Sequence, residues 1–168
     1  IDHYGEYPYP SLPRKWKDAV EKFTEDTLQA YGIGPWYINK MFYRLVEAFR
    51  KNEPDAILYY SANIGHYIAD SHVPLHCTEN YNGQMTNQHG IHGLWESRLP
   101  ELFASNYDYF MGRCQYIEKI QPFIWLAVHD SYAALDSVLA FEKLLTENSE
   151  SDKKYSFEQR GSTTIQVY

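Results

Sequence analysis

Apolar residues recur at intervals of three and four along most of this 168-residue chain, which is the spacing of one face of an α-helix. Gly32 and Gly34 end the first apolar stripe, and Pro74 ends the third, because proline lacks the N–H that a continuing helix requires. No segment alternates with the two-residue period of a strand. The pattern predicts an all-α multi-helix bundle, with helices over about residues 13–32, 35–52, 54 to just before Pro74, 90–104 and 122–146, and shorter helical candidates over 107–120 and from 155 onward.

The stretch from residue 66 to residue 96 interrupts this regular pattern and is rich in histidines and other polar residues. Residues 73–90 are rich in Pro, Asn, Gly, Thr and Gln and have no hydrophobic period, so they predict a long loop. Loops of that length inside compact domains are usually functional or disordered. Five of the seven histidines fall in the stretch, namely His66, His72, His76, His89 and His92.

Two histidine–carboxylate pairs in this stretch have helical spacing. His66 precedes Asp70 by four residues, and His92 precedes Glu96 by four, so each pair shares one helix face. A single such pair is more often a surface ion pair, but the repeat, with His76 between, favours a metal site. Imidazole nitrogens and carboxylate oxygens are the ligands of zinc and similar metals.

Other interpretations of these residues are weaker. A di-iron bundle would carry Glu-x-x-His on two helices, a form that neither pair has. Cys77 directly follows His76, and adjacent residues do not face one another, so the sequence does not indicate a cysteine nucleophile with a positioned base. Three further histidines are expected to be exposed, structural or outside the direct ligand set: His72, His89 and His129.

The length and net charge of the chain limit the kinds of fold and function that the sequence allows. The length suits one domain over residues 1–168. A formal net charge of −7 disfavours a nonspecific nucleic-acid binder, which needs a basic surface, although bound metal cations would reverse that sign locally. No apolar run approaches the ~20 residues of a membrane span. Cys77 and Cys114 permit one disulfide without requiring it.

The segments HYIADSHVPLH and GIHGLWESRLPE resemble the superfamily of zinc-dependent phospholipases C and single-strand-specific nucleases. That superfamily has His-x3-Asp-x5-His, a loop, and then His-x3-Asp/Glu with an aromatic residue before the acid. The matching positions in this chain are His66, Asp70, His76, His92, Trp95 and Glu96. The match is specific between about residues 54 and 100.

The resemblance implies a site of up to three zinc ions that hydrolyses phosphodiesters. It implies that His66 and Asp70 hold one zinc, with Asp70 bridging to another as the catalytic residue, and that His76, His92 and Glu96 hold the remaining ion. Glu96 stands in place of Asp, and the loop before His92 is short by the standard of the superfamily's nuclease branch. Both features favour phospholipase C-type substrates. A single-strand nuclease and a non-catalytic metal-binding domain are the alternatives.

The chain departs from the superfamily at its beginning. Ile1-Asp2 resembles the last two residues of a His-aromatic-x-Asp-x-Asp segment, and His3 aligns with no ligand position. We therefore expect a domain truncated at both ends, with fewer zinc ions than the complete protein. The expected partner is a phosphodiester substrate, with no stable nucleic-acid partner and no transmembrane segment. The resemblance also implies an extracytoplasmic location.

Overall fold

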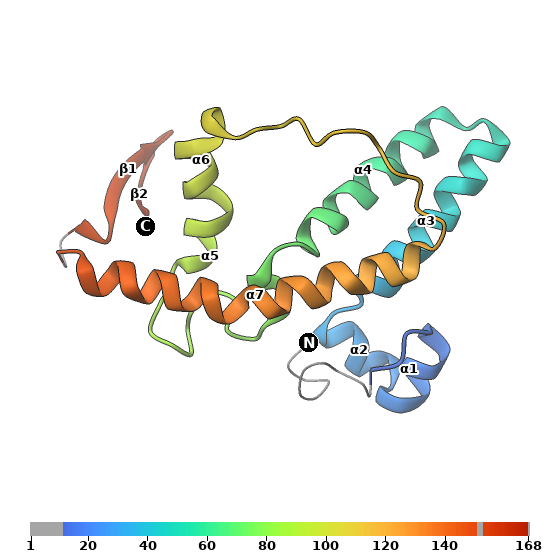
Figure 1. The fold of residues 1–168 in the computed structure, drawn as a ribbon, viewed down its shortest axis with the longest axis horizontal. Coiled ribbons are helices and arrows are strands. Elements are labelled where there is room, and N and C mark those ends of the chain that lie inside the picture. The colour runs from blue at the N-terminus through green and yellow to red at the C-terminus, as the bar shows by residue number, and fades with distance from the viewer. Residues whose placement is uncertain (1–11, 151–152, 168) are drawn as a thin grey trace. The chain divides into compact units, whose positions relative to one another are not determined.

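The computed structural model describes residues 12–150 and 153–167 of the chain. These residues are mostly helical, which confirms the all-α class in its coarse form (Figure 1). None of the helices in this part of the chain combines the length and hydrophobicity that a membrane crossing requires. The elements are α1 (Trp16–Phe23), α2 (Glu25–Tyr31), α3 (Gly34–Lys51), α4 (Pro54–Asp70), a 3₁₀ turn (Pro74–Cys77), α5 (Ile91–Gly93), a π-helical turn (Leu94–Arg98), α6 (Leu99–Phe103), a second 3₁₀ turn (Ala104–Asn106), α7 (Ile120–Asn148), β1 (Ser156–Arg160) and β2 (Thr163–Val167).

The chain divides into two compact units. The first unit takes in the residues up to Glu79 together with Tyr116–Ala133, and the second takes in Asn80–Gln115 and the residues from Ala134 onward. Helix α7 therefore contributes its first half to one unit and its second half to the other. That the chain is one domain stays a prediction.

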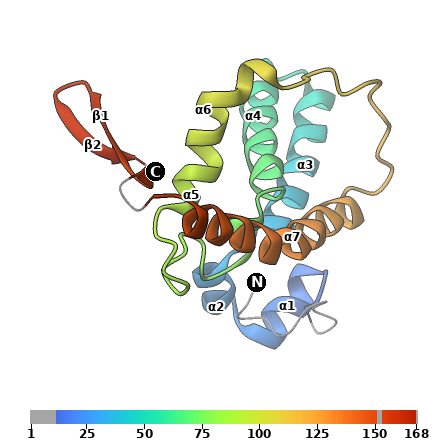
Figure 2. The ribbon, with the colours of Figure 1, turned by 60° about the vertical axis from the view of Figure 1, so that its left-hand side comes forward.

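Helices α3 and α4 form an antiparallel pair in the first unit, side by side in Figures 1 and 2. Asn52 ends α3 in the left-handed conformation at φ 53°, which asparagine tolerates better than most residues, and Pro54 begins α4 where no N–H is needed. Apolar side chains from α3, α4 and the start of α7 form one buried cluster, which contains Ile38, Met41, Ile64, Ile120 and Ile124.

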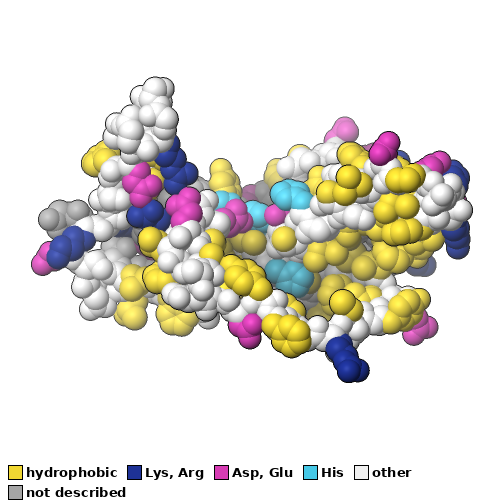
Figure 3. All heavy atoms as spheres, turned by 90° about the horizontal axis from the view of Figure 1, so that it is seen from above, with side chains coloured by type: hydrophobic (Ala, Val, Ile, Leu, Met, Phe, Trp, Pro, Cys, Tyr) yellow, Lys and Arg dark blue, Asp and Glu magenta, His cyan; other side chains and the backbone are white. Residues whose placement is uncertain are grey.

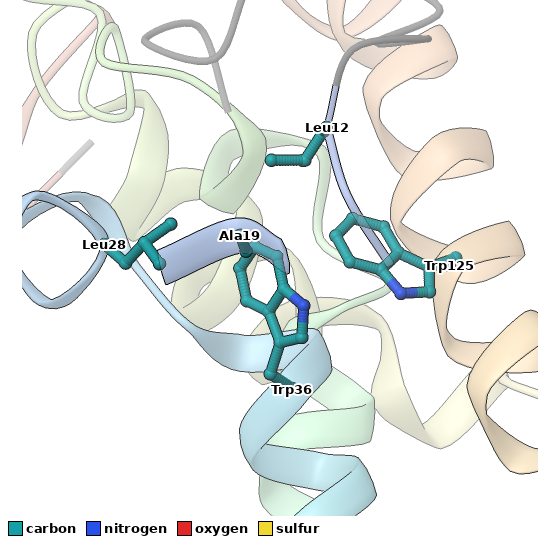
Figure 4. Packing of buried hydrophobic residues seen from close by; sticks show 5 residues of the cluster. All are labelled: Leu12, Ala19, Leu28, Trp36 and Trp125. Carbon is teal, nitrogen blue, oxygen red and sulfur yellow. The ribbon is translucent and has the colours of Figure 1, made fainter. Parts of the chain in front are cut away.

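A second buried cluster of the first unit is built around two tryptophans (Figure 4). The rings of Trp36 and Trp125 meet edge to face with centroids 5.1 Å apart, an arrangement that aromatic quadrupoles favour. Leu12, Ala19 and Leu28 complete the cluster, so it joins α1, α2 and α3 to α7.

The predicted helix over 13–32 is two helices, with a break at Thr24. Thr24 has φ 67°, which ends α1, and its Oγ1 accepts a hydrogen bond from the main-chain N–H of Thr27 at 3.4 Å, which caps α2. The apolar spacing continues across the break, so the pattern alone did not reveal it. The predicted helices over 35–52, from 54 to before Pro74 and over 122–146 are confirmed as α3, α4 and α7.

Two further predictions were wrong. Residues 107–119 form no helix, and Gly112 within them has φ 78°. The segment from 155 does not form a helix either, because β1 and β2 pair there as an antiparallel hairpin with Ser156 opposite Val167. Gly161 supplies the positive φ of the turn, and the β-branched residues of the second strand favour extended backbone.

The hairpin carries paired charges within the second unit. Arg98 lies 2.6 Å from Glu158 of β1, and Arg160 lies 3.1 Å from Glu101 of α6. Figure 3 shows basic and acidic side chains next to one another on this part of the surface. The two arginines share the two carboxylates Glu101 and Glu158, so the cluster offers no surplus positive charge.

Candidate metal centre

The first predicted pair lies on the last turns of α4. His66 Nε2 is 3.3 Å from Asp70 Oδ2, as the spacing of four residues requires on one helix face. The His66 side chain is 69% exposed and that of Asp70 is 36% exposed, so both donors can be reached from solvent.

His76 lies on the 3₁₀ turn that follows α4. Its neighbours Leu75 and Cys77 are buried, and Cys77 Sγ lies 3.7 Å from the main-chain oxygen of Val128. These two anchors leave His76 exposed between them. Its Nδ1 is 3.2 Å from the main-chain oxygen of Asp70 and 4.0 Å from Asp70 Oδ1. The first unit thus gathers His66 and His76 around Asp70.

The second predicted pair spans α5 and the π-helical turn of the second unit. His92 Nε2 is 3.1 Å from Glu96 Oε2, with both side chains about one-quarter to one-third exposed at 26% and 30%. His92 Nδ1 lies 3.1 Å from the main-chain oxygen of Tyr81. A carbonyl oxygen can only accept, so this contact places a hydrogen on Nδ1 and leaves Nε2 as the nitrogen on the side of Glu96.

The π-helical turn explains how the helix passes Pro100. Pro100 falls inside the predicted helix over residues 90–104, where a proline would be expected to bend or end it. Instead the Leu99 N–H donates to the Leu94 carbonyl, five residues back, and α6 continues from there. Pro100 lies in the first turn of α6, where a missing N–H has the least effect.

The remaining histidines have other surroundings. His72 Nδ1 lies 2.8 Å from the main-chain oxygen of Ile68, and the side chain is exposed. His89 is exposed, and its carbonyl accepts from the Tyr155 hydroxyl at 3.0 Å. His129 Nδ1 is 3.1 Å from Asp130 Oδ1. Each stays outside the proposed ligand set. His3 and Ile1-Asp2 lie outside the described residues.

The two cysteines differ in their surroundings. Cys77 is buried and Cys114 is exposed. The sequence left a disulfide between them open, and the structure forms none.

The chain matches no known family model, no curated protein and no solved structure. The roles of its residues are therefore argued from their own contacts.

Sequence reasoning missed the Tyr81 carbonyl beside His92 and two buried polar residues of the same unit. The carbonyl of Tyr81 belongs to the backbone, so no residue pattern marks it. Gln88 and Glu142 are both buried polar residues of the second unit. A signal for Glu142 was present, because it follows Leu135 and Val138 at intervals of three and four residues and so places an acid on the buried stripe of α7.

Proposed function

We propose that this protein hydrolyses phosphodiester bonds with a metal-activated water, and that it belongs with the zinc-dependent phospholipases C and single-strand nucleases. The supporting observation is the pair of helix-borne His–carboxylate contacts, at 3.3 Å and 3.1 Å, in the spacing that the superfamily uses. Each contact places an imidazole nitrogen beside a carboxylate oxygen, which is a ligand arrangement suited to zinc.

The proposal assigns His76, His92 and Glu96 to one ion. The contact between His92 and Glu96 supplies two of these ligand atoms, and the resemblance adds His76 as the third. Two imidazoles and one carboxylate are a common protein ligand set of catalytic zinc, which keeps its fourth position for water or substrate.

His66 and Asp70 are assigned to a second ion, with Asp70 as the bridge between sites. Asp70 suits that role because His66 approaches its Oδ2 and His76 approaches its Oδ1, so its two oxygens face different imidazoles. Bound zinc would lower the pKa of its water and neutralise charge on the phosphoryl oxygens. The named residues would hold the ions, with Asp70 shared between the two.

The substrates that we favour are phospholipids, cleaved at the headgroup. This preference is supported by Glu96 in place of Asp and by a loop before His92 that is short by the standard of the nuclease branch. The alternative is a single-strand nuclease. The acidic net charge of −7 gives no nonspecific attraction to a nucleic acid. An extracytoplasmic location is part of the same proposal, and a non-catalytic metal-binding domain is the competing function.

The test combines metal analysis with hydrolysis of bis-p-nitrophenyl phosphate. We expect the protein to bind zinc and to hydrolyse this substrate only when zinc is bound. His92→Ala should lower the rate of hydrolysis at least a hundredfold, because it removes one of the proposed zinc ligands. His129→Ala is the matched control, since His129 also contacts a carboxylate but lies outside the proposed set, and it should retain activity.

The outcomes separate the competing functions. Zinc binding without hydrolysis would support a non-catalytic metal-binding domain, and a protein that binds no zinc would contradict both. Comparing phosphatidylcholine with single-stranded DNA then divides the two enzyme classes. Faster cleavage of single-stranded DNA than of phosphatidylcholine would show that the protein is a nuclease rather than a phospholipase.

A further inference from the structure

The β1–β2 hairpin of the second unit has no core of its own. None of residues 156–167 is buried, and Phe157 is 73% exposed. A two-stranded hairpin that packs no hydrophobic face against a helix or a third strand is at best marginally stable in water. Its position beside α6, seen in Figures 1 and 2, therefore depends on the contacts that it makes with the rest of the unit.

Four charged side chains join the outer part of the hairpin to α6 and to the π-helical turn before it. Arg98 Nη1 lies 2.6 Å from Glu158 Oε1. Arg160 Nη2 lies 3.1 Å from Glu101 Oε1. A contact of 3.7 Å between Arg98 and Glu101, and one of 3.8 Å between the two hairpin charges, close the four into one network. The four side chains are 25% to 50% exposed, so water and dissolved ions reach them.

The contacts at the base of the hairpin are of another kind. Lys154 Nζ lies 3.0 Å from Glu142 Oε1, and the two side chains are only 16% and 3% exposed. The Tyr155 hydroxyl donates to the His89 carbonyl at 3.0 Å, a hydrogen bond between neutral groups. Salt screens exposed charges far more than buried pairs, because the Debye length falls from about 10 Å at 0.1 M to about 3 Å at 1 M. Added salt should therefore weaken the network and leave the base attached.

The hairpin also forms one wall of a cavity of about 630 Å³ within the second unit. Gly93 and Ser97 line this cavity from the helical side, and Ile165 and Val167 line it from β2. Ile165 is the cross-strand partner of Glu158, and such partners lie on the same face of a sheet. The face of the hairpin that the ion pairs hold is thus the face that encloses the cavity.

We infer that the β1–β2 hairpin is a strap, which charge holds against the cavity and which ionic strength releases. In dilute salt the network keeps both strands against the helical side, and the cavity keeps this wall. In concentrated salt the outer part of the hairpin detaches while Lys154 and Tyr155 hold its base, and the cavity opens to solvent. The inference is independent of the proposed function, because neither the network nor the base includes a proposed metal ligand.

Amide hydrogen exchange of residues 156–167 in increasing sodium chloride tests the inference. A detached hairpin loses the support that its strand hydrogen bonds require, so its amides exchange faster. Between about 0.05 M and 1 M salt the exchange rate should rise about threefold to tenfold, as expected when one or two exposed ion pairs are lost. Amides in the middle of α3 serve as the internal reference for direct effects of salt on exchange.

A double variant, Glu158→Gln with Arg160→Gln, replaces both hairpin charges by neutral amides. Its hairpin amides should exchange in dilute salt as fast as those of the unmodified chain in 1 M salt, and added salt should change them little. Arg50→Gln is the matched control. Arg50 lies 2.6 Å from Glu47 in an exposed ion pair of α3, so its loss should leave hairpin exchange and its salt dependence unchanged.

Hairpin exchange that is equal at the two salt concentrations in the unmodified chain would overturn the inference, and this measurement requires no variant to fold. A double variant that keeps the full salt dependence would also overturn it, because charges outside the network would then hold the hairpin. Salt that speeds exchange in α3 as much as in the hairpin would show general loosening of the fold rather than release of a strap.

Discussion

Three histidines near the candidate site share one local feature, an Nδ1 contact with a main-chain carbonyl. The partners are the carbonyls of Ile68 for His72, Asp70 for His76 and Tyr81 for His92. In each ring the contact places a hydrogen on Nδ1, because a carbonyl oxygen can only accept. This contact alone therefore does not separate a ligand from a bystander. The carboxylate within reach does, and it accompanies His76 and His92.

Gly83 provides the sharpest prediction at the scale of one residue. A Cβ at this position would lie 2.2 Å from the Gln88 main-chain oxygen, and the backbone has φ +71°. Gly83→Ala should therefore lower the free energy of unfolding by at least the ~1–2 kcal/mol of a left-handed alanine, with the clash adding to it. Urea denaturation measures the change.

Gly65→Ala is the control for Gly83→Ala. Gly65 lies inside α4 with nothing within 4 Å of its Cβ position, so alanine should stabilise the chain by roughly 0.5–1 kcal/mol. Equal effects of the two substitutions would show that the loop yields to the new methyl group, and would contradict the close packing of Gly83 on Gln88.

The donor residues could be predicted from the sequence because each pair depends only on helical spacing. His66 with Asp70, and His92 with Glu96, lie in contact for that local reason. The buried contact of Gln88 with Glu142 could not be predicted, since the two residues meet across more than fifty residues of chain. A contact of that range depends on tertiary packing, which no spacing rule contains.

At the scale of elements, the strong apolar stripes were predicted well and the short irregular pieces were not. Helices α3, α4 and α7 are long enough for several turns of periodic burial. The break at Thr24 and the hairpin from Ser156 depend on single backbone conformations, at Thr24 and Gly161, which a stripe of apolar residues does not encode. The consecutive Thr163 and Thr164, followed by Ile165, were a strand signal that the helical interpretation overlooked.

The contact between Glu142 of α7 and Lys154 of the following segment makes the stability of the fold depend on pH. Burial alone would raise the pKa of Glu142, but hydrogen bonds from Thr146, Gln88 and Lys154, together with the Lys154 charge, lower it below its ordinary value of 4.5. A carboxyl whose pKa is depressed on folding stabilises the fold above the unfolded pKa. That stabilisation is lost as pH falls through the lower, folded pKa.

We therefore expect the free energy of unfolding of the metal-free protein to fall as pH drops below about 4.5. Glu142→Gln removes the titrating group, so its stability should depend less steeply on pH in that window. Lys154→Met should flatten the profile in part, because it removes one of the causes of the depressed pKa. Urea denaturation at a series of pH values measures this, and parallel profiles for Glu142→Gln and the unmodified chain would contradict it.

At the scale of the whole molecule, the proposed ion takes ligands from both compact units. His76 belongs to the first, and His92 and Glu96 belong to the second. A ligand that binds only the folded state stabilises it by about 2.7 kcal/mol at one hundred times its dissociation constant. If one zinc requires donors from both units, that stabilisation should reach both of them.

Amide hydrogen exchange with and without zinc distinguishes a shared ion from a local one. We expect zinc to slow exchange in α3 and α4 of the first unit and also in α6 and the β1–β2 hairpin of the second, and a chelator to reverse both effects. His92→Ala should abolish the zinc effect in the second unit and reduce it in the first, where His66 and Asp70 would still hold their own ion. Slower exchange confined to the second unit would show that His92 and Glu96 bind zinc without His76, and the ion would then not link the two units.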